Sequence, residues 1–171
     1  MTRIETSRLV LRAPRPDDAP CIALGMGEFE VARWLAPVPW PYTLAMAIDW
    51  VRMAPENGLF VVDLPGRGLI GCVVLGAELG FWIGRPHWGR GYATEAASAV
   101  LDWYFRTSDE PEISSIAHHA NKSSLRVKAK LGFVETGRDR RFSHALGHNV
   151  EHVVSTLTRA DWLAGEAKRC A

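Results

Sequence analysis

Cysteine is scarce in this chain of 171 residues, which has only Cys21, Cys72 and Cys170. Their spacing matches neither a disulfide framework nor a metal-binding motif, so we expect reduced thiols and no metal site. Long apolar runs are also absent. None approaches the roughly 20 residues that a membrane helix needs, and residues 1–5 lack an apolar signal core. These absences predict a cytoplasmic protein with no membrane partner.

Neither sign of charge is in excess. The chain has 20 basic and 19 acidic residues and a net charge of +1, which gives no support to nucleic-acid binding. A hydrophobic content of 47% and a charged content of 23% are ordinary for a globular protein. Because there is no internal repeat and no low-complexity segment, we expect a single domain over residues 1–171, with a core at about 8–164.

The chain is organised around residues 84–97, where a glycine-containing turn joins a strand to a helix. The compact apolar run at 79–83 predicts the strand. Downstream, apolar residues recur at intervals of three and four and predict one helix face: Ala93, Ala96, Ala97, Val100, Leu101 and Tyr104. Gly89 and Gly91 let a ligand approach the backbone, and the first helical N–H groups lack intrahelical acceptors. The place suits an anion such as a pyrophosphate, with Arg90 as counter-charge and Glu95 as a cap of the helix.

Two familiar phosphate loops do not fit this stretch. A P-loop has Lys and then Ser or Thr after its last glycine, whereas Tyr92 and Ala93 follow here. A dinucleotide-binding fingerprint needs a third glycine at the position held by Thr94. Neither a P-loop nucleotidase nor a Rossmann dehydrogenase is therefore indicated.

The run from Trp88 to Ala96 resembles the acyl-CoA pyrophosphate loop of the GNAT superfamily of N-acetyltransferases. It is most similar to the RimJ/RimL-type branch of ribosomal-protein N-terminal acetyltransferases. Three further stretches match that branch in the expected order: residues 6–12, residues 121–133 with Asn-x-x-Ser followed by Lys-Leu-Gly-Phe, and residues 155–162. The resemblance therefore spans nearly the whole chain.

The fold that this resemblance implies is α/β (α+β), with a mixed, mostly antiparallel central sheet of about six to seven strands flanked by helices. The strand before the loop and the strand before Asn121 splay apart and hold acyl-CoA between them. The sequence itself predicts strands at about 9–12, 59–64, 69–75, 78–83, 113–118, 133–142 and 150–157, with helices near 17–26, 29–35, 44–53, 93–104 and 122–131 and a helical turn after Thr158. Thr43 and Asn121 are expected to cap the helices that follow them. The strand at 133–142 carries a basic run, Arg138, Arg140 and Arg141, and residues 143–149 are expected to form a polar loop. The proline-rich segment 37–42 is either a rigid linker or one wall of the acceptor site.

The resemblance also assigns residues to acetyl-CoA, the expected acyl donor. The pyrophosphate loop comprises Trp88, Gly89, Arg90, Gly91, Tyr92, Ala93 and Thr94, and Asn121 and Lys128 also line the cofactor. Backbone N–H groups of Phe81, Trp82 and Ile83 are expected to polarise the thioester carbonyl, as in an oxyanion hole.

The leaving thiolate needs a partner. Many GNAT enzymes have a Tyr four residues after the position of Ser124, and this chain has Lys128 there. Spacing of four places Ser124 and Lys128 on one helix face. In the RimJ/RimL branch the serine is the usual candidate; because Ser is a weak acid, we expect Ser124 to hydrogen-bond the sulfur or relay a proton. The alternatives are that Ser124 only caps the helix and that Lys128 is a solvated surface lysine.

Four residues are candidates for the general base. Glu78 precedes the cofactor loop and ranks first, Glu151 begins the last strand and ranks second, and His118 and His119 should point to opposite sheet faces. A weak base suffices if the acceptor is an α-amine, whose pKa is lower than that of lysine. None of the three cysteines has a nearby base in the sequence, so we expect direct attack without an acyl-enzyme.

The sequence therefore predicts an acetyl-CoA-dependent N-acetyltransferase that acts on a primary amine. The α-amine of a protein N-terminus is the first candidate acceptor. A small amine, such as an aminoglycoside or an amino-acid derivative, is the alternative, and a non-catalytic acyl-CoA-binding module is a third reading. Homodimers are common in the resembling branch, so a homodimer is one expected assembly.

Overall fold

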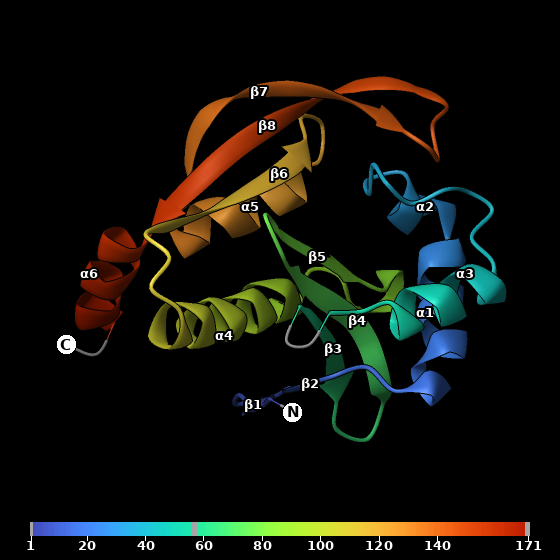
Figure 1. Cartoon of the computed structure of the whole chain (residues 1–171), viewed down its shortest axis with the longest axis horizontal. Coiled ribbons are helices and arrows are strands. Elements are labelled where there is room, and N and C mark those ends of the chain that lie inside the picture. The colour runs from blue at the N-terminus through green and yellow to red at the C-terminus, as the bar shows by residue number, and fades with distance from the viewer. Residues whose placement is uncertain (1, 56–57, 170–171) are drawn as a thin grey trace.

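The computed structural model describes residues 2–55 and 58–169. The strands described form a five-stranded sheet in the order β1-β2-β3-β4-β5 and a three-stranded sheet in the order β6-β8-β7 (Figure 1). Their bounds are β1 Arg3–Glu5, β2 Val10–Arg12, β3 Leu59–Leu64, β4 Gly68–Leu75, β5 Leu79–Ile83, β6 Glu112–His118, β7 Val134–Ser143 and β8 His148–Thr158. All pairings within the two sheets are antiparallel, which confirms the mixed, mostly antiparallel α/β prediction.

The strand pattern departs from the prediction in two places. β1 was not predicted; it pairs with β2 as an edge strand of only three residues, too short for a hydrophobic alternation to show. The predicted polar loop at 143–149 is much shorter, because β7 and β8 pair all the way to Ser143 and His148. The long β7–β8 hairpin arches over the molecule toward α2 (Figure 1).

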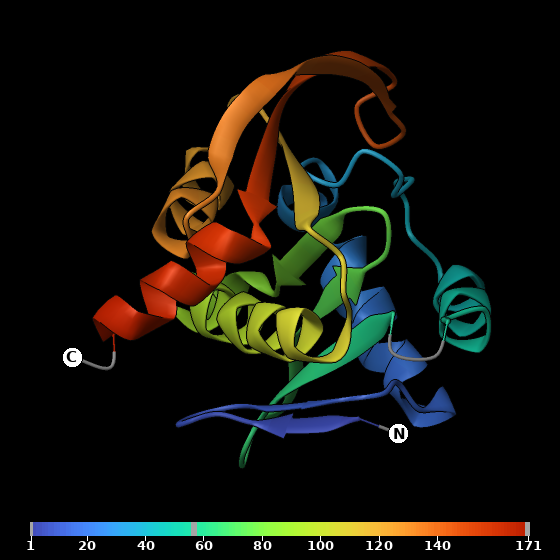
Figure 2. The same ribbon diagram turned by 60° about the vertical axis from the view of Figure 1, so that its left-hand side comes forward.

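Helices cover both faces of the five-stranded sheet. The described helices are α1 Ala19–Gly27, α2 Phe29–Ala32, α3 Leu44–Arg52, α4 Tyr92–Thr107, α5 Lys122–Leu131 and α6 Arg159–Arg169, of which α5 contacts β6 and α6 contacts β8. Side chains alternate along β3, so Phe60 and Val62 pack toward α4, whereas Leu59 and Val61 pack toward α1 and α3. Figures 1 and 2 show α1 and α3 on the opposite side of this sheet from α4. Both faces of the central strand are therefore buried.

Two predicted helix caps are confirmed, and the predicted helical turn after Thr158 is corrected. Thr43 accepts a hydrogen bond from the N–H of Met46 at the start of α3, and Asn121 caps α5. After Thr158, however, the chain forms the full helix α6 instead of one turn. Within the described residues, no helix has the length and apolar composition that crossing a membrane requires. Cys170 lies outside the described residues.

The two sheets meet where β5 and β6 run side by side in parallel. The contact is a single bridge between Glu78 and Ser114, supported by a hydrogen bond of 2.8 Å from the Ser115 hydroxyl to the Leu79 carbonyl. Beyond this point the two strands belong to separate sheets and diverge (Figure 1). The predicted splayed pair is therefore present, and it divides the predicted single sheet into two.

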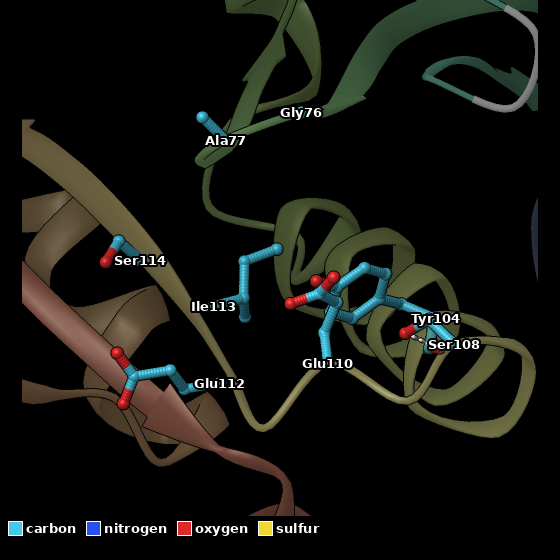
Figure 3. A pocket seen from close by; sticks show the side chains of 8 residues that line it. All are labelled: Gly76, Ala77, Tyr104, Ser108, Glu110, Glu112, Ile113 and Ser114. Carbon is cyan, nitrogen blue, oxygen red and sulfur yellow. Dashed lines mark hydrogen bonds between the residues drawn. The ribbon is translucent and has the colours of Figure 1, made fainter.

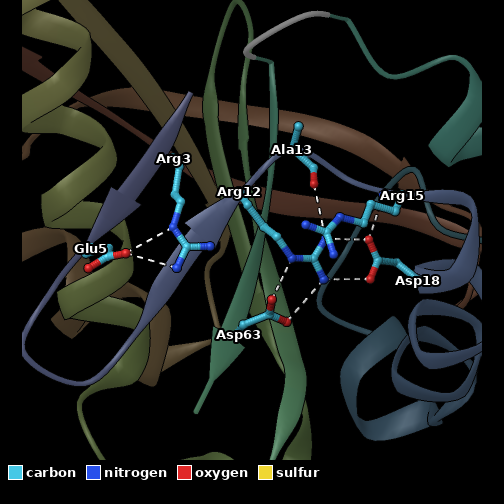
Figure 4. A network of polar contacts seen from close by, with 7 residues as sticks. All are labelled: Arg3, Glu5, Arg12, Ala13, Arg15, Asp18 and Asp63. Atoms are coloured by element: carbon cyan, nitrogen blue, oxygen red, sulfur yellow. Dashed lines mark hydrogen bonds and ion pairs between the residues drawn. The ribbon is translucent and has the colours of Figure 1, made fainter. Parts of the chain in front are cut away.

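A buried charge network ties β2 to β3 and to the start of α1 (Figure 4). The Arg12 guanidinium donates two hydrogen bonds of 2.8 Å to Asp18 and one of 2.6 Å to Asp63. The Arg12 and Asp18 side chains are only 12% and 9% exposed. Burial alone would raise the pKa of Asp18, but the hydrogen bonds from Arg12 outweigh it and lower that pKa. The network fixes the first strand against the helical layer.

Arg12→Met is expected to reduce the free energy of unfolding by about 3 kcal/mol, because it leaves two partly buried carboxylates unpaired. Denaturant titration at pH 7 measures this loss.

Arg3→Met is the matched control: the Arg3 side chain is 56% exposed and pairs with Glu5 at the surface, so its loss should stay within about 0.5 kcal/mol. The folded-state pKa of Asp18 lies below its ordinary 3.8, so the network stabilises fully above that pH. The difference between wild type and Arg12→Met should therefore shrink as the pH falls below 3.8; equal losses for both variants at pH 7 would contradict the assignment.

Candidate active site

The glycine loop connects the end of β5 to Tyr92, the first residue of α4. Gly89 and Gly91 have φ angles of +73° and +81°, in the left-handed region that glycine adopts without strain. Gly91 is the N-cap residue of α4, and no side chain caps that helix. The first N–H groups of α4 and the positive end of its dipole are therefore left to a ligand, and an anion suits them.

Trp88 anchors this loop. Its indole Nε1–H donates a hydrogen bond of 2.5 Å to the Ile83 carbonyl, while the side chain stays 43% exposed. The side chain of Arg90 is exposed beside the loop, as a counter-charge would be. Tyr92, Ala93 and Thr94 form the first turn of α4 and are half-buried.

Glu95 does not cap α4, contrary to the prediction. Its carboxylate accepts hydrogen bonds from Thr6, Ser7 and Arg8 of the N-terminal segment. A reciprocal capping box needs a side-chain acceptor at the N-cap, and Gly91 offers none. The prediction used only local spacing, whereas the partners of Glu95 come from residues 87 to 89 positions away in the chain.

One edge of β5 faces the gap between the sheets. The Gly84 N–H donates to Ile70 O, and in an antiparallel ladder alternate residues bond the same neighbour. Trp82 therefore directs its backbone groups to β4, whereas Leu79, Phe81 and Ile83 direct theirs to the other edge. The Leu79 and Ile83 carbonyls indeed accept from Ser115 and Trp88. Of the three predicted N–H donors, Phe81 and Ile83 face the gap and Trp82 does not.

Ser124 lies in the first turn of α5. Its N–H donates to the Asn121 side chain at 3.1 Å, which is the predicted cap. The Ser124 hydroxyl has no hydrogen-bond partner in the part of the chain that the structure describes, and the residue is half-buried. The cap thus uses the serine backbone and leaves the hydroxyl for a ligand.

Lys128 is buried, which rules out the alternative that it is a solvated surface lysine. Only 1% of it is exposed, and Nζ donates to the Ser115 carbonyl at 3.1 Å and the Val153 carbonyl at 3.4 Å. Burial lowers the pKa of Lys128 from 10.5 to about 8, partly offset by the negative charges of Glu78 and Glu135. Since Ser115 also bonds Leu79, this ammonium lies at the point where β5 and β6 part.

Glu78 and Glu151 are both held in ion pairs. Arg141 of β7 donates two hydrogen bonds to Glu78, of 3.0 and 2.6 Å, and one of 2.8 Å to Asp139, so Arg141 spans the gap between the sheets. Glu151 pairs with Arg138 at 2.6 Å and is 47% exposed. Glu151 lies two residues before Val153, whose backbone carbonyl accepts the hydrogen bond from Lys128 Nζ. Glu78 adjoins the gap directly; Glu151 does not.

The two neighbouring histidines differ from the prediction. His118 and His119 do not point to opposite faces; their rings stack with centroids 5.0 Å apart, because β6 ends at His118 and a turn follows. His118 Nδ1 accepts from the Ala120 N–H at 3.0 Å, which occupies the lone pair a base would use. Burial, followed by its positively charged neighbours, lowers the pKa of His118. The ring is therefore neutral near pH 7 but is not arranged as a base.

The proline-rich segment joins two parts of the molecule. Trp40 Nε1–H donates to the Gly27 carbonyl at 2.9 Å, and its ring packs edge-on against Phe29. Just before the segment, the Ala36 carbonyl accepts from the N–H of His144 in the β7–β8 turn. This hydrogen bond joins the turn of the β7–β8 hairpin to the segment that follows α2.

A pocket of about 580 Å³ opens at the other end of α4 from the glycine loop (Figure 3). Tyr104 and Ser108 of that end, the hairpin turn Gly76–Ala77 and residues 110–114 line it. Since α4 is 16 residues long, this pocket is distinct from the glycine loop. It reaches Ser114, the residue bridged to Glu78.

Residues 8–134 match the family model described as an acetyltransferase (GNAT) domain. The chain belongs to the GNAT family. The alanine N-acetyltransferase of ribosomal protein uS5 from Escherichia coli (strain K12) is 32% identical to this GNAT chain over 182 residues, covering 95% of the chain and 94% of the relative. GNAT enzymes are acetyl-CoA-dependent acyltransferases, so this protein is one.

Solved GNAT structures share the fold over nearly the whole chain. An acetyltransferase of this family from Bacillus anthracis has a TM-score of 0.82 at 21% identity and covers 93% of this chain and 99% of its own. A spermidine N-acetyltransferase from Vibrio cholerae, in complex with CoA and spermine, has a TM-score of 0.78 at 20% identity, covering 92% and 99%. These likenesses confirm the fold class.

Three features of the site were missed by sequence reasoning. Arg141 was noted only as part of a basic run, and Arg8 only as part of a matching stretch. One feature of the sequence could have indicated that Lys128 is buried. Lys128 lies four residues after Ser124 and three before the buried Leu131, so all three share the inward face of α5. A lysine in an otherwise inward-facing position indicates a buried amine.

Proposed function

We propose that this GNAT enzyme transfers the acetyl group of acetyl-CoA to the α-amine of a protein N-terminus by direct attack. The observation that carries the transfer chemistry is the junction of β5 and β6, where backbone donors on a free strand edge lie next to a buried ammonium. The identity of the acceptor rests on the relative of 32% identity, which is named for acetylating an alanine of a ribosomal protein.

The diphosphate of acetyl-CoA would bind the N–H groups from Gly89 to Ala93. The positive end of the α4 dipole and the exposed Arg90 favour the negative charge of the diphosphate. Gly89 and Gly91 have no side chains that would keep the ligand away from the backbone N–H groups. The pantetheine arm would then follow the β5 edge into the gap between the sheets. There the N–H of Phe81 or Ile83 is a donor for the thioester carbonyl.

At the junction the amine nitrogen attacks the carbonyl carbon, the new C–N bond forms and the C–S bond breaks. The departing thiolate takes a proton from the Lys128 ammonium, and Ser124 donates a hydrogen bond to the sulfur. The amine loses its proton to Glu78. A proton that passes from Glu78 to Lys128 through water then restores both groups, and the charge of Glu78 raises the pKa of Lys128.

Glu78 is the better of the two candidate bases. A carboxylate has about four lone pairs, and the Arg141 pair uses two of them, which orients Glu78 without exhausting its acceptors. Glu151 is paired at the surface instead. The two Glu→Gln variants therefore form a matched comparison.

Glu78→Gln is expected to lower kcat/KM for the acceptor about tenfold at pH 7. The loss is modest because an α-amine, with a pKa near 7.7–8.0, is partly unprotonated without help. Glu151→Gln should change the same constant less than twofold. Release of CoA thiol from acetyl-CoA measures both, and a larger loss for Glu151→Gln would reverse the assignment.

The acceptor is tested with a peptide that has a free N-terminal alanine, the same peptide blocked at its N-terminus but carrying a lysine, spermidine and an aminoglycoside. We expect thiol release with the first peptide and a product acetylated at its α-amine by mass spectrometry. Preference for spermidine or the aminoglycoside would establish the small-amine alternative. Binding of acetyl-CoA without turnover of any acceptor would establish a non-catalytic acyl-CoA-binding module.

A further inference from the structure

The N-terminal segment converges on one carboxylate at the start of α4. Glu95 accepts hydrogen bonds from the Thr6 hydroxyl at 2.6 Å, the Ser7 hydroxyl at 3.1 Å and the Arg8 N–H at 3.0 Å. The Arg8 guanidinium adds Nε at 2.7 Å and Nη2 at 2.6 Å. Burial alone would raise the pKa of Glu95, but these bonds outweigh it and lower that pKa, so the carboxylate is ionised at neutral pH.

Arg8 also contacts the glycine loop itself. Its Nη1 donates to the Arg90 carbonyl at 3.0 Å, and the guanidinium carbon lies 4.7 Å from the centre of the Tyr92 ring. Its Nη2 would lie 3.4 Å from a Cβ atom at Gly91. One side chain thus contacts Arg90 and Tyr92 and lies beside Gly91 between them, although it comes from a position 82 residues before Arg90.

The charges explain why such a contact matters. Glu95 is an anion in the first turn of the helix that would receive the diphosphate, and two like charges there repel each other. Arg8 neutralises Glu95 and at the same time fixes the Arg90 carbonyl. Without Arg8, the Arg90 carbonyl would lose this hydrogen bond. Glu95 would also lose its ion pair with Arg8 and would be a negative charge without a counter-ion beside the phosphates.

We propose that Arg8 is a positioning residue of the diphosphate loop, which sets the affinity for CoA by holding residues 90–92 and by neutralising Glu95. This inference rests on the proposed CoA site at Gly89–Ala93. Arg8 acts through the loop and not on the reacting atoms, so its removal affects binding of the nucleotide half of CoA and leaves the chemical step intact.

The test measures the Kd of CoA by titration calorimetry for Arg8→Ala, Glu95→Gln and the double variant. We expect Arg8→Ala to raise the Kd about tenfold. The double variant should bind CoA more tightly than Arg8→Ala alone, because it also removes the unpaired carboxylate. Arg3→Ala, which replaces another exposed N-terminal arginine, should bind CoA with the wild-type Kd.

A second experiment compares acetyl donors. Arg8→Ala should lower kcat/KM for acetyl-CoA but not for acetyl-pantetheine, which lacks the diphosphate.

The outcomes separate the proposals. If wild type does not bind CoA, the proposed function fails. If wild type binds CoA and Arg8→Ala binds it equally well, this inference alone is overturned. It is also overturned if the double variant is no tighter than Arg8→Ala, which would show that the charge of Glu95 does not oppose the diphosphate. A fall in acetyl-pantetheine turnover as large as that in acetyl-CoA turnover would overturn it too, because it indicates a role in folding only.

Discussion

Lys128→Met is expected to lower kcat about 100-fold at pH 7 with little change in the KM for acetyl-CoA. The reason is that the buried Nζ supplies the proton for the departing thiolate, a role that methionine has no proton to fill. Thiol release at saturating acetyl-CoA and peptide measures kcat. Lys130→Met, which replaces an exposed lysine of the same helix, is the matched control and should retain full activity.

The pH dependence of kcat distinguishes a proton donor from a structural lysine. With a pKa of about 8, Lys128 is charged at pH 7 and loses its proton as the pH rises, so wild-type kcat should fall above about pH 8. The charged groups that act on it are Glu78, next to β5, and Glu135 of β7. Removing either carboxylate, as in Glu135→Gln, should move the alkaline limb to lower pH. An unchanged alkaline limb in Lys128→Met would exclude the assignment.

Stability should change in the opposite direction to activity. The pKa of Lys128 falls from 10.5 to about 8 on folding, which corresponds to a cost of about 3 kcal/mol for the charged form. That cost is fully present below pH 8 and disappears as the pH rises toward 10.5. As the pH rises from 8 to 10, wild type should therefore gain stability relative to Lys128→Met, in which position 128 does not titrate. A stability difference between the two proteins that stays constant over this range would contradict the lowered pKa of Lys128.

Gly91→Ala is expected to raise the Kd of CoA about 100-fold. A Cβ atom is strained at φ +81°, whereas its distance of 3.4 Å from Arg8 Nη2 is an ordinary van der Waals contact, so the backbone strain is what should shift the loop. The N–H groups that would bind the diphosphate shift with it. Calorimetric titration with CoA measures the change.

Gly66→Ala controls for backbone strain alone. Gly66 has a φ of +78° in the β3–β4 turn, and a Cβ there meets nothing within 4 Å. Both variants should therefore lose a similar amount of stability, about 1 kcal/mol, while only Gly91→Ala loses CoA affinity. Equal CoA binding by the two variants would show that the loop conformation does not determine affinity.

The sequence predicted those parts of the fold that local patterns determine. The apolar runs of β3 to β5, the glycine turn before α4 and the Asn121 cap of α5 each follow from neighbouring residues, and the structure has all of them. The splay between β5 and β6 came from the family resemblance, because no local pattern shows which strands fail to pair.

The rest depended on contacts between distant segments. Glu95 was predicted as a local cap, but its partners lie near the N-terminus. Glu78 looked like a free base, but Arg141 reaches it from a strand 63 residues later. Lys128 was expected either to line the cofactor or to be solvated, and its burial was not predicted, because the carbonyl acceptors of its ammonium come from β6 and β8. Such pairings appear only when the sheets are assembled.

A crystal structure with CoA bound is the most direct test of the central claim, that the junction of β5 and β6 holds the reacting thioester. We predict the diphosphate on the N–H groups of Gly89 to Ala93 and the sulfur within hydrogen-bond distance of Lys128 Nζ or the Ser124 hydroxyl. CoA bound elsewhere, for example in the pocket beside Tyr104, or a sulfur far from both side chains, would contradict the account.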